Sequence, residues 1–317
     1  MLAPIRIDRE PAAKKAPLPA EDTPHRIFDR ALLAQRRQRV AALAQDYDFL
    51  LARVADDLAE RLAIVRRTFP LAANIGAHHG LVSRAIAGIA GVETIIDVDA
   101  TPELLTRCPG LRVVADEEAL PFGDASLDLV VSGLSLQLVN DLPGALVQMR
   151  RALKPDGLFL GALLGGATLR ELREAWLAAE AELTGGASPR VAPFADVRDM
   201  GSLLQRAGFA LPVVDSDTVK VTYADPLALM REVKAMGGSN MLSARGRVPV
   251  TRGLLLRAAE IYAERFAAAD GRVPATYEIL TLTAWAPDEN QPKPLRPGSA
   301  QTRLADALGV KETKLKE

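Results

Sequence analysis

Residues 71–80 read LAANIGAHHG, an apolar run that leads through Gly76 and Gly80 toward a helix-like segment over 81–87. A second apolar run, over 93–98, follows and ends next to Asp99. Glycines at such a place let the backbone turn tightly from a strand into a helix and approach a ligand closely. A strand, a glycine turn, a helix and another strand make up the repeating unit of a parallel sheet wound with helices.

Further apolar runs extend this pattern along the chain. The segments between them are long enough for the crossover helices that parallel strands require. We therefore expect an α/β, Rossmann-like fold with a seven-stranded, mostly parallel sheet. The predicted strands are 71–76, 93–98, 111–115, 127–132, 158–164, 213–221 and 275–285.

Two helices are predicted before the sheet. The stretch 28–44 is rich in good helix formers, and Asp46 or Asp48 is placed to cap the helix that follows it. That second helix carries an apolar residue about every fourth position, which predicts one buried stripe. The stripe consists of Leu50, Val54, Leu58, Leu62 and Val65. Later helices are expected over 168–183, 197–207, 226–236 and 250–269.

The chain divides into a leader, one domain and a tail. The proline-rich leader lacks a hydrophobic period, so we expect it to be disordered; a transit peptide is the alternative, although acidic residues in the leader speak against it. The tail is rich in prolines and charges and is expected to be flexible. The predicted boundaries are 1–24 for the leader, 25–287 for the domain and 288–317 for the tail, with N-terminal helices over 28–66, a ligand-binding core over 70–165 and a helical insertion over about 223–272.

Composition excludes several classes of function. The 39 Lys and Arg nearly cancel the 40 Asp and Glu, so no overall field would gather nucleic acid. The single cysteine, Cys108, excludes an internal disulfide and is expected to be a small buried residue, while three histidines give no metal triad. No apolar run is long enough to span a bilayer. We expect a soluble protein without a metal site, cytoplasmic in a bacterium or in the mitochondrial matrix of a eukaryote.

Acidic residues follow the second and third predicted strands. Asp97 and Asp99 end the second strand, about twenty residues after the glycine turn, where a carboxylate can bind the hydroxyls of a ribose. Asp116 and Glu117 follow the third strand, where a carboxylate can accept a hydrogen bond from an adenine amino group. Singly, the turn is compatible with an ordinary tight turn and each acid with a solvated loop carboxylate. Their order along the sheet edge favours a nucleotide-like ligand.

In this order of landmarks the chain resembles the class I S-adenosylmethionine-dependent methyltransferases over about 70–165. The segment 126–132, SLDLVVS, and the turn 153–157, LKPDG, are similar to that family's later landmarks. Over most of its length the chain resembles one branch, that of the mitochondrial complex I assembly factor 5, a protein-arginine hydroxylase, and its bacterial relatives. The segments that carry this likeness are 27–30 (IFDR), 115–122 (ADEEALPF), 139–143 (VNDLP), 165–169 (GGATL) and 273–277 (VPATY).

The resemblance implies that S-adenosylmethionine is the cofactor. Asp99 would then hold the ribose, Asp116 the adenine amino group, and the backbone from Gly76 to Gly80 the methionine portion. The cofactor-binding residues implied in this way are Asn74, Gly76, Ala77, Gly80, Asp97, Asp99, Asp116, Glu117 and Ser132. No catalytic residue is assigned.

Two residues depart from the family's glycine motif. Asn74 stands where an acid is usual, and His78 stands where a glycine is usual. If that position needs a positive φ, a histidine costs about 1 kcal/mol relative to glycine. We therefore expect cofactor binding to be weakened rather than lost. A segment that often carries a histidine in this branch has Gln137 instead. A glutamine side chain does not exchange protons, so it cannot replace the histidine as an acid or a base.

Some residues have two readings. Arg36, Arg37 and Arg39 are expected on a solvated helix face, and the alternative is contact with an anionic group or a partner. Tyr223 and Tyr277 flank the insertion, either as core residues with a wet hydroxyl or as part of a substrate cavity.

Three hypotheses about function remain. The resemblance implies an enzyme that modifies a protein arginine, with an iron–sulfur subunit of NADH:quinone oxidoreductase as the implied substrate, and for that we expect a cavity with acidic residues. A small-molecule or carrier-protein methyltransferase, similar to the malonyl-carrier enzyme of biotin synthesis, would instead have a basic rim, with Arg150 and Arg151 as candidates. A non-enzymatic assembly chaperone would not bind the cofactor. Hydroxylation rests on the resemblance alone, since the sequence shows no iron triad or flavin motif.

Overall fold

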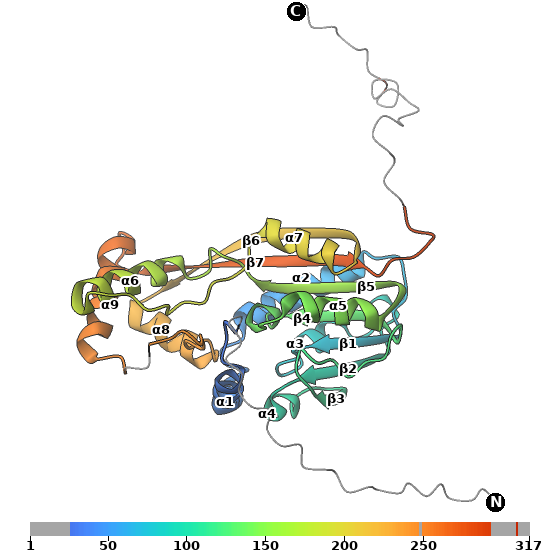
Figure 1. The fold of residues 1–317 in the computed structure, drawn as a ribbon, viewed down its shortest axis with the longest axis horizontal. Helices are drawn as coiled ribbons and strands as arrows, with labels where there is room; N and C mark the ends of the chain where they lie inside the picture. The colour runs from blue at the N-terminus through green and yellow to red at the C-terminus, as the bar shows by residue number, and fades with distance from the viewer. Residues whose placement is uncertain (1–25, 247–248, 293–308, 310–317) are drawn as a thin grey trace, which may run out of the picture.

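The computed structural model describes residues 26–246, 249–292 and 309 of the 317-residue chain. One twisted sheet runs through the molecule in the order β3-β2-β1-β4-β5-β7-β6 (Figure 1). Only β7 runs against its neighbours, which confirms the predicted seven-stranded, mostly parallel sheet. The strands are β1 Leu71–Ile75, β2 Thr94–Asp99, β3 Leu111–Val114, β4 Leu127–Gly133, β5 Leu153–Leu164, β6 Ala210–Tyr223 and β7 Val273–Trp285.

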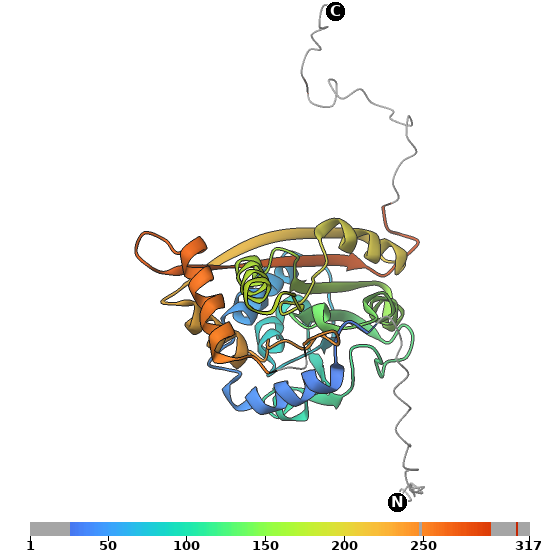
Figure 2. The same cartoon turned by 60° about the vertical axis from the view of Figure 1, so that its left-hand side comes forward.

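Helices cover both faces of the sheet, and a group of them gathers at one end. Helices α6, α8 and α9 lie around the ends of β6 and β7 that reach beyond the other strands (Figures 1 and 2). The helices are α1 Arg30–Val40, α2 Phe49–Ala63, α3 Leu81–Ile86, α4 Pro102–Leu105, α5 Leu142–Ala152, α6 Arg170–Thr184, α7 Val197–Arg206, α8 Pro226–Ala235 and α9 Arg252–Phe266. Short 3-10 turns occupy Ala41–Leu43, Ile89–Gly91 and Leu136–Leu138.

The predicted leader, 1–24, and most of the predicted tail, 288–317, fall outside the described residues. Within the described part of the chain, no helix combines the length and the apolar character needed to cross a membrane.

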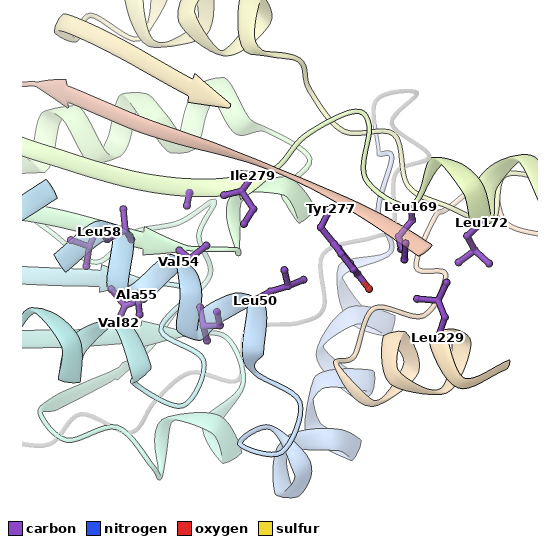
Figure 3. Packing of buried hydrophobic residues seen from close by; sticks show 14 of the residues in the cluster. Leu50, Val54, Ala55, Leu58, Val82, Leu169, Leu172, Leu229, Tyr277 and Ile279 are labelled. Carbon is purple, nitrogen blue, oxygen red and sulfur yellow. The ribbon is translucent and has the colours of Figure 1, made fainter. Parts of the chain in front are cut away.

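The apolar stripe of α2 anchors one face of the sheet. Leu50, Val54 and Leu58 are buried as the spacing predicts (Figure 3). Leu62 is buried as well, whereas Val65 is only partly buried. On the other face, α5 and α7 contribute Leu146, Met149 and Leu204 to a second apolar cluster with Phe159 and Phe209. Burial on both faces accounts for the continuous apolar runs of β1, β4 and β5 in the sequence.

The helical insertion between β6 and β7 shares its apolar packing with the sheet. Leu229 of α8 and Tyr262 of α9 belong to the same cluster as Leu58 of α2, and Tyr277 of β7 lies between the two regions (Figure 3). The long antiparallel pairing of β6 with β7 carries this group outward, because Tyr223 still pairs with Val273 at its far end.

Helix α1 is shorter than the stretch 28–44 predicted for it. Asp29 caps it, since its Oδ1 accepts from Leu32 N at 3.0 Å, and the helix gives way to a 3-10 turn after Val40. Phe28 lies outside the helix and forms a bridge with Leu242 of the insertion. The N-terminal helix is therefore attached to the insertion as well as to the sheet region.

Candidate active site

The glycine turn after β1 is closed by a neighbour that leaves no room for a side chain. Gly76 has a φ of +66°, and a Cβ there would collide with the side chain of Ser135. Ser135 lies just after β4, so the turn and the end of β4 are pressed together at the carboxyl edge of the sheet. Both the backbone conformation and the contact require glycine at this position.

His78 continues the turn in the left-handed region, with a φ of +51°. The condition under which a histidine here is costlier than glycine, a positive φ, is therefore met. Burial is the main reason that the pKa of His78 falls to about 4, and Arg37 lowers it further, so the ring is neutral at physiological pH. Its Nε2 is shielded from solvent and has no hydrogen-bond partner in the described structure.

Asp99 holds the turn against the end of β2. Its Oδ2 accepts from the backbone N–H of His78 at 3.0 Å, and its Oδ1 accepts from Thr101 N at 2.8 Å. The side chain is fully buried. Each carboxylate oxygen can accept a second hydrogen bond, so these contacts leave acceptor capacity for a ligand.

Asn74, Asp97 and Ser83 form a separate polar cluster beneath the turn. Asn74 Nδ2 donates to Ser83 Oγ at 2.9 Å and to Asp97 Oδ1 at 3.2 Å, and Ser83 also donates to Asp97. Burial raises the pKa of Asp97. These residues hold β1, β2 and α3 together and do not line the cavity described below. Asn74 thus acts within this closed cluster.

The other predicted ligand-binding residues lie close around this edge. Ser132 Oγ donates to Ile75 O at 2.8 Å and ties β4 to β1. Ala77 packs in a small apolar cluster with Cys108, which is buried as expected. A Cβ on Gly80 would approach Cys108 as well. These residues support the glycine turn through contacts with β1 and Cys108.

Two acids after β3 are bound by arginines of α1. Arg30 Nη2 contacts Asp116 Oδ1 at 2.8 Å and also the carboxylate of Glu117, and Arg37 Nη1 lies 3.6 Å from Glu117 Oε1. Ser135 donates to Glu117 as well. Burial alone would raise the pKa of Glu117, but the two arginines outweigh it and hold the pKa at about 2. Glu117 is therefore ionised although it is buried.

Among the arginines of α1, Arg37 contacts an anionic group, as one interpretation of the sequence proposed. It is only 7% exposed and faces the carboxylate of Glu117. Arg36 donates to Asn240 O, whereas Arg39 is exposed. Arg30 is a site residue that was not predicted from the sequence. Its signal was present in the segment 27–30, which pointed to a family without pointing to a contact.

A cavity of about 790 Å³ begins at the glycine turn and extends beneath the insertion. His78 and Leu134 line it near the sheet edge, while Trp176 of α6, Met230 of α8 and Tyr277 of β7 line it further out. Most of the remaining lining side chains are apolar. The cavity therefore joins the candidate ligand-binding edge to the insertion.

Tyr277 lines this cavity and Tyr223 does not, although their hydroxyl oxygens lie 3.2 Å apart. Of the two roles considered for these tyrosines, Tyr277 is part of the cavity lining and Tyr223 is a core residue. Burial raises the pKa of Tyr277 to about 12, so its hydroxyl keeps its proton.

The charged groups of the cavity are mostly basic. Asp48 is the acidic residue among the described lining residues, and its Oδ2 lies 3.0 Å from His79 Nε2. Because a carboxylate only accepts, His79 Nε2 carries the proton of this hydrogen bond. Asp48 also occupies the position before α2, but its side chain bonds His79 instead of capping the helix. The basic lining residues are Arg37, Arg190, Lys234 and Arg252.

This charge pattern differs from both expectations. An arginine substrate led us to expect several acidic residues in the cavity, but Asp48 is the acidic residue among the described lining residues. The basic residues expected for a carrier-protein substrate, Arg150 and Arg151, do not line the cavity and lie in the last turn of α5. In the described part of the chain, no group of three or more His, Cys, Asp or Glu side chains is arranged to hold a metal ion.

Comparison with known proteins identifies the family. A family model described as a methyltransferase domain matches residues 73–161. The chain is 40% identical to the arginine-hydroxylase NDUFAF5 of Danio rerio over 287 residues, which cover 88% of this chain and 89% of the relative. The chain belongs to this methyltransferase-fold family. The human NDUFAF5 protein is 41% identical over 88% of this chain and 83% of its own length.

The same family includes bacterial relatives with another name. A malonyl-[acyl-carrier protein] O-methyltransferase of Halorhodospira halophila is 38% identical over 82% of this chain and 86% of its own length. Among solved structures, a methyltransferase-like protein of Bacillus halodurans aligns with a TM-score of 0.53 at 17% identity, over 73% of this chain and 99% of its own. The class I methyltransferase fold and the family likeness expected from the sequence are confirmed.

Proposed function

We propose that this protein binds S-adenosylmethionine at the carboxyl edge of β1, β2 and β3. The observation that carries the proposal is the order of Gly76, Asp99 and Asp116 along three neighbouring strand ends. These three residues do not line the cavity themselves, but the turn that they flank contributes His78 and His79 to its lining. Asp99 retains acceptor capacity for ribose hydroxyls, and Asp116 Oδ2 makes no hydrogen bond within the described residues and is free to accept from the adenine amino group.

The residues present fit the cofactor with two restrictions. His78 brings a Cβ and a neutral ring to a place where glycine would leave more space, and Asn74 supplies no charge to the open edge. When bound, S-adenosylmethionine supplies a methyl group on a sulfonium, whose transfer depends mainly on positioning. In this chain the turn backbone would orient the methionine portion, and burial keeps the ring of His78 uncharged beside it.

We further propose that the protein modifies a protein arginine during assembly of respiratory complex I, in a bacterial cytoplasm or a mitochondrial matrix. Support comes from the relatives named as arginine-hydroxylases, which match across most of the chain. The subunit implied by the resemblance is an iron–sulfur subunit of NADH:quinone oxidoreductase. Asp48 would receive the guanidinium, because it is the carboxylate among the described residues that line the cavity.

A second candidate function is methylation of a malonyl group on a carrier protein. The observation in its favour is the excess of basic residues in the cavity, where Arg37, Lys234 and Arg252 suit an anionic group better than a guanidinium. The relative of Halorhodospira halophila bears the corresponding name.

One experiment in two stages tests these proposals. Titration calorimetry with S-adenosylmethionine and S-adenosylhomocysteine comes first, and micromolar binding would support the cofactor assignment. Failure to bind either compound would favour the chaperone reading. The protein is then incubated with an arginine-containing iron–sulfur subunit, dioxygen and a two-electron reductant, with and without S-adenosylmethionine, and, separately, with malonyl-carrier protein and S-adenosylmethionine. Mass spectrometry that detects one added oxygen on the arginine supports the first function, and a methyl ester on the malonyl group supports the second.

A further inference from the structure

We propose that Arg30 is a positioning residue that orients Asp116 for recognition of the cofactor's adenine. The inference deepens the proposed function and rests on it. The sequence marked the segment 27–30 without assigning it a role, and the structure places its last residue on both acids that follow β3.

Asp116 is held by one oxygen and open at the other. Its Oδ1 accepts from Arg30 Nη2 at 2.8 Å and from the backbone N–H of Glu118 at 2.9 Å. Its Oδ2 makes no hydrogen bond in the described structure, and the side chain is 39% exposed. Two donors on Oδ1 fix the plane of the carboxylate, so Oδ2 points away from both donors with an unused acceptor site. A carboxylate held in this way needs no reordering when it accepts from an amino group.

Arg30 is itself held firmly. Its Nη1 donates to Leu138 O at 3.1 Å, while its Nη2 bridges Asp116 and Glu117. The guanidinium is only 17% exposed, and the two carboxylates outweigh burial and raise its pKa, so it stays charged. Without this bridge, two adjacent carboxylates would repel each other. The fork of donors on a guanidinium suits this bridging role better than an ammonium does.

The residues before Arg30 connect it to two parts of the molecule. Phe28 N donates to Asn140 Oδ1 at 2.8 Å, and Asn140 Nδ2 returns a bond to Phe28 O at 3.1 Å, which ties the segment to the loop before α5. Asp29 N donates to Met241 O at 2.8 Å, and Asp29 Oδ2 lies 3.0 Å from Arg245 Nη2, which ties it to the insertion. The position of the adenine acid is therefore set jointly by the core and by the insertion that covers the cavity.

If Arg30 only stabilises the fold, its loss should weaken the binding of every ligand at this edge by the same factor. If Arg30 positions Asp116 for the adenine, its loss should weaken only the binding of ligands that carry the 6-amino group. The test compares S-adenosylhomocysteine with its analogue that carries hydrogen in place of the 6-amino group. Both are titrated calorimetrically into the full-length chain and into the variants Arg30→Ala and Arg30→Lys. Arg39→Ala serves as the matched control, because Arg39 lies exposed on the same helix.

We expect the unsubstituted chain and Arg39→Ala to prefer the amino compound by about tenfold, the value of one net hydrogen bond to a charged group. Arg30→Ala should bind the amino compound about tenfold more weakly and the analogue nearly as before, so the preference disappears. Arg30→Lys should restore part of it. Should Arg30→Ala fail to fold by circular dichroism, Arg30→Lys decides alone, since it keeps the charge but loses the bridge and should show a reduced preference.

Equal losses for both compounds, or an unchanged preference in the Arg30 variants, would overturn the positioning role. Those outcomes leave the proposed cofactor binding intact. Failure of the unsubstituted chain to bind either compound would overturn the proposed function, and the inference with it.

Discussion

Acidification should destabilise the protein through Glu117, and the structure gives the size of the effect. Burial opposes ionisation of this carboxyl, but Arg37, Arg30 and Ser135 hold its pKa at about 2, against an ordinary value of 4.5. A carboxyl whose pKa is lowered by folding contributes stability that is fully present above the unfolded pKa and is lost as the pH falls toward the folded pKa. The two pKa values differ by an amount worth roughly 3 kcal/mol.

The assay is urea unfolding followed by circular dichroism, at several pH values between about 6 and about 2.5. The contribution of Glu117 to the unfolding free energy should stay constant above the unfolded pKa of 4.5 and fall below it, because the unfolded state then binds a proton at this carboxyl and the folded state does not. Glu117→Gln removes the titrating group, so its stability should be lower near neutral pH and should depend less on pH. The matched control is Glu93→Gln, because Glu93 is exposed and its variant should keep the pH dependence of the parent.

The reasoning is refuted if the parent and Glu117→Gln lose stability in parallel on acidification. That result would mean that Arg37 and Arg30 do not hold the buried carboxyl in its ionised form. A drop in stability confined to pH values above the unfolded pKa would contradict it as well, since no proton is taken up there.

Three other changes have expected outcomes. Gly76→Ala should lower the unfolding free energy by roughly 2–4 kcal/mol, from the positive φ and the collision with Ser135, and Ser135→Gly should rescue most of the collision part in a chemical-denaturation cycle. Asp99→Ala should weaken S-adenosylhomocysteine binding about tenfold or more by calorimetry, while Asp99→Asn, which keeps one oxygen, should lose less; unchanged affinity would remove Asp99 from the site. Leu58→Ala should cost about 2–5 kcal/mol in thermal or urea unfolding, because Leu58 is fully buried beneath the sheet.

The sheet could be predicted because each of its strands leaves a local signal. The runs that form β1 and β4 are apolar on both faces, and the long β6 and β7 were recognised within a few residues of their ends. The start of α1 was misjudged by two residues, because Phe28 instead pairs with Leu242 at a distance in sequence that no helix pattern reveals.

Site residues could be predicted only where they directly follow a strand in the sequence. The sequence raised the question of a positive φ at His78 through its place in the glycine motif, and the structure answers it with a φ of +51°. The partners of Glu117 could not be foreseen, since Arg30 and Arg37 come from a helix about eighty residues earlier. The hydrogen bond between Asp48 and His79 could not be foreseen either. Asp48 was predicted to cap α2, but its side chain contacts His79 instead.

The insertion begins and ends at two residues that lie opposite each other in the antiparallel pair of β6 and β7. Tyr223 closes β6, Val273 opens β7, and the two face each other in register. A segment whose ends meet in this way can be exchanged for another without altering the strand order, provided that the replacement keeps the contacts of Met241 and Arg245 with Asp29. We expect that replacing 224–272 with the matching segment of a relative would change which substrate the cavity admits while the sheet is retained. One scaffold could then serve relatives with as different names as arginine-hydroxylase and malonyl-carrier methyltransferase.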